Sequence, residues 1–108
     1  MGHIEQVITD AVKGKSTIVM GNTAIQTQNG ITSVTLHSST IMTINHNRRI
    51  ITLSSCGYKT NITKSRMNLV LDALHTNMCI KQINKKWFVV RFNGEIFTEF
   101  TDGMYIVY

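Results

Sequence analysis

Residues 58–66, YKTNITKSR, place cationic and hydroxyl side chains where a helix is predicted to begin. The cations are Lys59, Lys64 and Arg66, and the hydroxyl groups are those of Thr60, Thr63 and Ser65. Unpaired backbone N–H groups already make a helix N-terminus electropositive, so cations are unfavourable there without a counter-charge. A bound anion satisfies the N–H groups and the cations together. The stretch therefore predicts a phosphate site. The alternative is that these side chains are solvated and point away from the helix end.

A second basic segment, HNRR at residues 46–49, contributes Arg48 and Arg49 at a predicted turn and could hold another phosphate. Tyr58 lies beside the first segment and is suited to stacking on a base. The chain carries a net charge of +5, and no acidic residue falls between Ala11 and Leu71. Such a one-sign section forms a positive face if its residues converge in space. A chance distribution within a β-rich segment is the alternative.

The residue types give little indication of metal binding, catalysis or a phosphate-binding loop. The four histidines have no spacing suited to a metal, so no metal ion or cofactor is expected. His37 could act as a base, but a hydrogen-bonded structural role is the simpler expectation. Cys56 precedes cations that would favour a thiolate, although a small buried residue before a turn accounts for it as well. The GKS at residues 14–16 lacks the preceding glycine and the strand-to-helix context of a phosphate-binding loop. No enzyme signature is found.

The predicted site requires a helix, and residues 63–75 supply one. Met67, Val70, Leu71 and Leu74 recur at the spacing of a buried helical stripe. Thr63 is the predicted N-cap, with Ile62 and Met67 as a hydrophobic staple. A second amphipathic pattern predicts an N-terminal helix over residues 3–13.

The remaining segments are β-branched and separated by turn residues. Strands are expected before Asn29-Gly30 and over residues 31–37, 40–45 and 49–54. After the helix, the segments MCIKQI, KWFVVRF, EIFTEF and MYIVY continue the pattern, and Trp87 is expected in the core. The short connections favour antiparallel pairing between sequence neighbours. The fold class is therefore α+β, a single small domain over residues 1–108, mainly antiparallel sheet with hairpins.

The cysteine content and the hydropathy of the chain indicate the cellular compartment in which the protein is expected. Cys56 and Cys79 are expected to be reduced and buried. Two cysteines that lack metal-ligand spacing, in a chain that looks cytosolic, are usually buried free thiols. A disulfide between them is the less favoured alternative. No apolar run approaches the length of a membrane helix, so no membrane partner is expected. The N-terminal residues have no secretory apolar region.

Four segments resemble a group of small tailed-bacteriophage proteins: TLHSSTI, TLSSCGYKTNITKSRMNLVLDAL, KKWFVV and FTDGM. The resemblance covers about residues 22–106. It implies a phage-encoded protein made in the cytoplasm of an infected bacterium. It brings no known activity, so it assigns no residue a role.

Two functions of different classes remain open. The first is non-enzymatic binding of a polyanion through the basic middle section, with DNA or RNA preferred to a phosphate-bearing nucleotide. The second is a protein-interaction module, for instance an inhibitor of a host defence system or a host enzyme. The segment MYIVY could serve the second function, because a late strand can form a sheet edge. A homo-oligomer built through that edge fits the same pattern.

Overall fold

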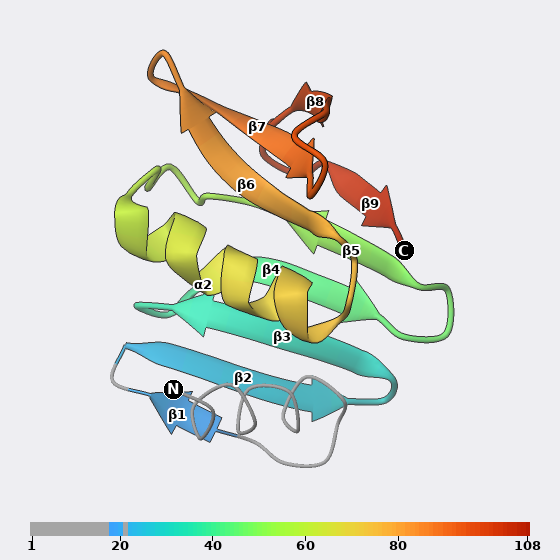
Figure 1. Ribbon diagram of the computed structural model, residues 1–108. Helices are drawn as coiled ribbons and strands as arrows, with labels where there is room; N and C mark the ends of the chain where they lie inside the picture. The colour runs from blue at the N-terminus through green and yellow to red at the C-terminus, as the bar shows by residue number, and fades with distance from the viewer. Residues whose placement is uncertain (1–17, 21) are drawn as a thin grey trace.

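Two antiparallel sheets and one helix form the part of the chain that the computed structural model describes, residues 18–20 and 22–108 (Figure 1). Sheet A has the order β1-β2-β3-β4-β5-β9 and sheet B the order β6-β7-β8. The strands of sheet A are β1 (Ile18–Met20), β2 (Thr23–Gln28), β3 (Ile31–Leu36), β4 (Ser39–Asn45), β5 (Ile50–Leu53) and β9 (Tyr105–Val107). Those of sheet B are β6 (Met78–Ile83), β7 (Lys86–Arg91) and β8 (Ile96–Glu99). The predicted helix at residues 3–13 lies outside the described residues.

Tight turns join most neighbouring strands, as their residues predict. Asn29 and Gly30 have φ of 55° and 78°, the left-handed conformation that a type I′ hairpin turn needs. The β3–β4 turn uses His37 and Ser38, with φ of 50° and 68°, and therefore comes one residue earlier than predicted. The His37 N–H donates to the Asn22 carbonyl, which ties this turn to the start of β2.

The helix α2 spans Asn61–Ala73, so it begins and ends two residues before the predicted bounds. The predicted N-cap was wrong. Thr60, in an extended conformation, is the N-cap and accepts a hydrogen bond from the Thr63 N–H. With the cap at Thr60, Ile62 and Met67 do not occupy the two positions of a hydrophobic staple. At the other end His75 adopts φ of 56° and donates to the Asp72 carbonyl. This left-handed residue stops the helix.

The hydrophobic core lies between one face of sheet A and a second layer made of α2 and sheet B (Figure 1). Sheet A places Val34, Ile44 and Ile51 in the core, because alternate side chains of a strand face the same side. Met67 and Leu71 of α2 are fully buried against them, as the helical stripe predicts. Sheet B adds its own buried residues, Ile80, Trp87 and Val89.

Strand β9 breaks the rule that sequence neighbours pair. It follows sheet B in the chain but pairs with β5 of sheet A, where Ile51 faces Ile106. The preceding turn is anchored by Asp102, whose Oδ1 accepts hydrogen bonds from both the N–H and the hydroxyl of Ser55 at 2.8 Å. The two ends of this crossover are thereby joined beside the loop that leads into α2.

Candidate nucleic-acid interface

The start of α2 has the unpaired donors that the sequence predicts. Thr60 Oγ1 lies 3.3 Å from the Thr63 nitrogen and 3.1 Å from its hydroxyl. The N–H groups of Asn61 and Ile62 have no acceptor within the helix, since the first turn of any helix lacks them. No acidic residue stands in this turn. The terminus is therefore electropositive and only partly capped.

Lys59 turns away from the helix and toward sheet B. Its Nζ lies 6.0 Å from the centroid of the Phe100 ring. The Phe100 ring in turn packs edge-on against Trp87, with the two ring centroids 5.3 Å apart. The Phe100 N–H also donates to the Trp87 carbonyl. Because Trp87 stands at the beginning of β7, Lys59 is held at the same end of the molecule as the β6–β7 turn.

The other two cations of the stretch diverge from Lys59. Lys64 is half-buried on a surface hollow of about 440 Å³ that also includes Ser65 and Asp72. Arg66 is half-buried, and its Nε donates to the Thr23 hydroxyl at 2.9 Å, across to β2. Arg66 therefore has a structural contact, and the three predicted cations do not converge on the helix N-terminus.

Sequence reasoning missed two lysines at this end. Lys85 forms the β6–β7 turn with Asn84, and Lys86 begins β7; both are exposed. The turn and the loop before α2 lie at the same end of the molecule (Figure 1). The predicted turn at Asn84-Lys85 was the available signal, but pairing it with Lys59 needs the tertiary structure.

We call Lys59, Lys85 and Lys86 the basic end. Two carboxylates lie nearby, those of Glu99 in β8 and Asp102 in the following turn. The Asp102 carboxylate already accepts two hydrogen bonds from Ser55. Three lysines against two carboxylates leave the basic end with a net positive charge.

Arg48 and Arg49 lie at the opposite end of sheet A, in the β4–β5 turn, and do not join the basic end. Arg48 is exposed. The Arg49 Nε donates to the Tyr108 carbonyl at 2.6 Å. The Arg49 guanidinium also stacks over the Tyr108 ring, with its Cζ 4.6 Å from the ring centroid. Burial raises the pKa of the Tyr108 phenol, and the Arg49 guanidinium lowers it by less.

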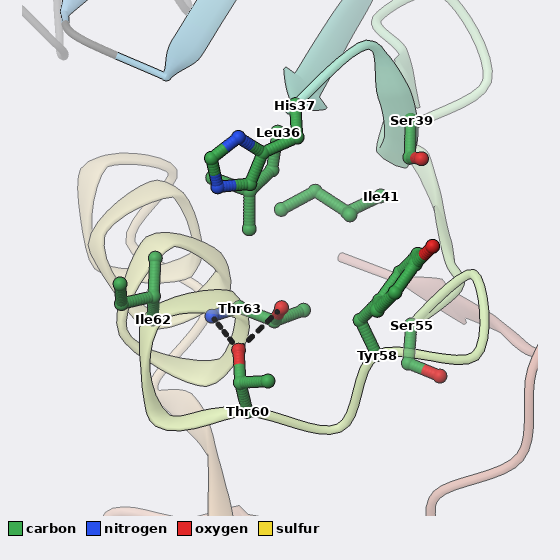
Figure 2. Close-up of a pocket in the computed structure, with 9 residues that line it drawn as sticks. All are labelled: Leu36, His37, Ser39, Ile41, Ser55, Tyr58, Thr60, Ile62 and Thr63. Carbon is green, nitrogen blue, oxygen red and sulfur yellow. Dashed lines mark hydrogen bonds between the residues drawn. The ribbon is translucent and has the colours of Figure 1, made fainter.

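A pocket of about 420 Å³ opens beside the start of α2 (Figure 2). Leu36 and Ile41 are buried in its wall, and Tyr58 and His37 stand on its two sides. The remaining lining residues are Ser39, Ser55, Thr60, Ile62 and Thr63. Tyr58 and Lys59 are consecutive, so the loop that carries them separates this pocket from the basic end.

The residues that could do other chemistry are engaged in structural contacts. His37 Nε2 accepts from the Asn22 amide at 3.1 Å, and Cys56 Sγ donates to the Thr40 carbonyl at 3.1 Å. Cys56 and Cys79 are both free; Cys56 is exposed and Cys79 half-buried, so the prediction that both are buried was wrong. The reason is that Cys56, with φ of 53°, belongs to a turn outside the sheet. Among the described residues, no group of three or more His, Cys, Asp or Glu side chains could hold a metal.

In the described part of the chain β9 is an edge strand of sheet A, and its outer edge forms a second exposed surface. The Met104 carbonyl accepts from the Leu53 N–H, and the Tyr108 N–H donates to the Arg49 carbonyl just before β5. Because backbone groups alternate along an antiparallel strand, those of Tyr105 and Val107 point away from β5. Both side chains are about two-thirds exposed. A cleft of about 560 Å³ adjoins this edge, and the exposed rings of Phe92 and Phe97 line its other side.

The described part of the chain, with two antiparallel sheets and one helix, defines a small α+β protein. The chain belongs to the Kyanoviridae Gp96 protein family of bacteriophages, whose family model matches residues 1–107. The resemblance to small phage proteins is thereby confirmed, and the family carries no assigned activity. No curated protein and no solved structure matches the chain. None of the helices in the described part is long and apolar enough to cross a membrane.

Proposed function

We propose that this phage protein is a non-enzymatic binder of polyanions, acting inside the infected bacterium, with DNA or RNA favoured over a single nucleotide. One observation carries the proposal. Lys59 is seated over Phe100 at the end of the molecule that also bears Lys85 and Lys86, so cations from two separate parts of the sequence share one end. A nucleic-acid backbone offers the repeated phosphates that such spaced cations match.

The arrangement favours a chain of phosphates over one phosphate. The cations of the predicted helix-start site diverge, and Arg66 is committed to Thr23. A compact cradle for a single phosphate is therefore not assembled from them. Exposed lysines such as Lys85 and Lys86 act as separate point charges, each suited to one phosphate of an extended ligand.

Charge reversal on matched lysine and arginine positions tests the proposal. Lys86→Glu and Arg48→Glu each change the net charge by the same amount, at opposite ends of the molecule. With single-stranded oligonucleotides, Lys86→Glu is expected to weaken binding and to reduce the slope of log affinity against log salt by about 0.7. Arg48→Glu is expected to leave the slope close to that of the wild type.

Three results would contradict this expectation in different ways. Equal losses of affinity in both variants would mean that binding depends on the net charge of the protein and not on where the charge lies. Saturation by one mononucleotide, with no gain from longer oligonucleotides, would assign a nucleotide site instead. Salt-independent binding, or none, would remove the polyanion proposal altogether.

A second candidate function is a protein-interaction module that pairs with an extended segment of a host protein through β9. The favouring observation is the outer edge of Tyr105 and Val107 beside a cleft that the exposed rings of Phe92 and Phe97 line. An added strand would gain backbone hydrogen bonds there and seat its side chains against Phe92 and Phe97. Val107→Pro removes one outward N–H while leaving the β5 pairing of Ile106 intact.

The partner-binding test uses nuclease-treated lysates from infected cells. A protein captured by the wild type and lost with Val107→Pro would support the edge. Retention of that protein by Val107→Pro would exclude the edge as its docking site. Capture that depends on untreated nucleic acid would return the case to the polyanion proposal.

A further inference from the structure

We infer that the pocket between the β3–β4 turn and the start of α2 receives one unpaired base of the nucleic acid bound at the basic end. This inference rests on the proposed function and adds a subsite to it. The pocket, of about 420 Å³, falls within the size range of small-ligand sites. Its position beside Tyr58, one residue from Lys59, lets a base enter while its backbone follows the lysines.

The walls of the pocket suit a planar, weakly polar ring. Leu36 and Ile41 are 6% and 2% exposed and give an apolar floor. Tyr58 and His37 stand on opposite sides of it, with Ile41 between them in the view of Figure 2. Tyr58 is 64% exposed, so its ring is available for stacking before any ligand arrives. Aromatic rings that border an apolar slot are the usual platform for an unpaired base.

The His37 ring is held in place by a chain of hydrogen bonds from the helix. Arg66 Nε donates to the Thr23 hydroxyl, which donates to Asn22 Oδ1 at 3.2 Å. The Asn22 amide nitrogen then lies 3.1 Å from His37 Nε2. An amide N–H₂ group can only donate, so Nε2 is the acceptor of this bond. The ring is therefore held in a fixed orientation.

The backbone of His37 adds to this fixed orientation. His37 and Ser38 both have positive φ, which is uncommon for residues other than glycine. The His37 N–H is bound to the Asn22 carbonyl at 2.9 Å, so the same residue holds both the backbone and the ring. A wall that is already ordered loses little conformational entropy when a base binds.

The polar groups of the lining give little basis for reading one base over another. The hydroxyls of Ser55 and Thr63 are buried and already engaged, with Asp102 and Thr60. Stacking is tolerant of sequence because every base presents a π-face. We therefore expect the subsite to require a base without selecting its identity.

The test compares an intact single-stranded oligonucleotide with an abasic one of the same length, which has the same phosphates. Wild-type protein is expected to bind the abasic strand at least about 5-fold more weakly, the lower limit for one stacked base. Tyr58→Ala is expected to lose the same factor on the intact strand, with no further loss on the abasic one. Tyr58→Phe should retain wild-type binding, because it keeps the ring.

The matched control is Tyr105→Ala, which removes a tyrosine of equal exposure, 65%, outside the pocket. It is expected to bind both strands as the wild type does. The salt slope should be unchanged in every tyrosine variant, because no phosphate contact is removed. Thermal unfolding of Tyr58→Ala close to that of Tyr58→Phe shows that the loss is not due to misfolding.

Equal affinity of the wild type for intact and abasic strands would overturn the inference. If that binding still weakens with salt and depends on Lys86, the proposed function stands without the base subsite. Failure to bind either strand removes both. A loss in Tyr105→Ala equal to that in Tyr58→Ala would assign the effect to exposed aromatic surface in general and also overturn the pocket.

Discussion

Among substitutions at the partly or fully exposed positions of α2, Asn68→Ala should destabilise the protein most. The Asn68 side chain bonds to both backbone groups of Ile80: its amide donates to the carbonyl at 3.0 Å, and its Oδ1 accepts from the N–H at 2.6 Å. β6 is an edge strand of sheet B, so these two bonds replace the missing neighbour.

The magnitude follows from the burial of Ile80, which is 2% exposed. Asn68→Ala leaves the N–H and the carbonyl of Ile80 without partners, at a cost of roughly 1–3 kcal/mol for each buried group. We expect Asn68→Ala to lower the free energy of unfolding by about 2–6 kcal/mol. Asn68→Asp should also destabilise, because it keeps the acceptor but sets a carboxylate oxygen against the Ile80 carbonyl.

Urea denaturation followed by far-UV circular dichroism measures this loss as a shift of the midpoint at constant slope. Ser65→Ala, on an exposed position of the same helix, is the control and should stay within about 0.5 kcal/mol of the wild type. If Asn68→Ala unfolded at the same urea concentration as Ser65→Ala, the bridge between α2 and β6 would not stabilise the fold, and the reasoning would be refuted.

Three further predictions concern the cap, the thiols and the C-terminal tyrosine. Thr60→Ala should lower the free energy of unfolding by about 1 kcal/mol through loss of the α2 N-cap, and a smaller loss than in Asn61→Ala would contradict the assignment. Cys56 should react with a thiol reagent in the native protein much faster than Cys79, and mass spectrometry should show no disulfide; equal rates would contradict the exposure of Cys56. The raised pKa of Tyr108 means that its phenol favours the folded state below the ordinary value near 10, and that this contribution is lost as pH rises through the higher folded-state pKa. In an ultraviolet titration, native Tyr108 should therefore ionise above the ordinary tyrosine value near 10, and Arg49→Met should delay its ionisation further, because the guanidinium lowers the pKa.

Local signals in the sequence predicted the elements well and their ends less well. The stripe of Met67, Val70 and Leu71 identified the helix, because burial on one face imposes its period on the sequence. The cap was misplaced because both Thr60 and Thr63 can accept a backbone hydrogen bond, and only the extended conformation of Thr60 decides between them. At the other end nothing local required His75 to take the left-handed conformation.

The candidate site was predicted only in part, because its composition depends on long-range packing. Lys59 lies at the basic end, whereas Lys64 lies in a separate surface hollow and Arg66 is drawn to Thr23 by a contact between distant elements. Arg48 lies at the opposite end of sheet A, because the whole length of β5 separates the β4–β5 turn from the loop that leads into α2. Lys85 and Lys86 were not predicted to belong to the site, because only the tertiary structure brings the β6–β7 turn to the same end as Lys59.

The late arrival of β9 has a consequence for synthesis on the ribosome. β5 has its inner partner as soon as β4 is made, but its other side stays unpaired until Tyr105–Val107 emerge. At roughly 5–20 residues per second, the interval from Leu53 to Tyr105 takes about 3–10 s. During that interval the nascent chain presents an open apolar strand, Ile50–Leu53, to other nascent chains and to chaperones. A ribosome stalled before residue 104 would therefore hold an aggregation-prone intermediate, and rapid translation of the C-terminal third would be protective.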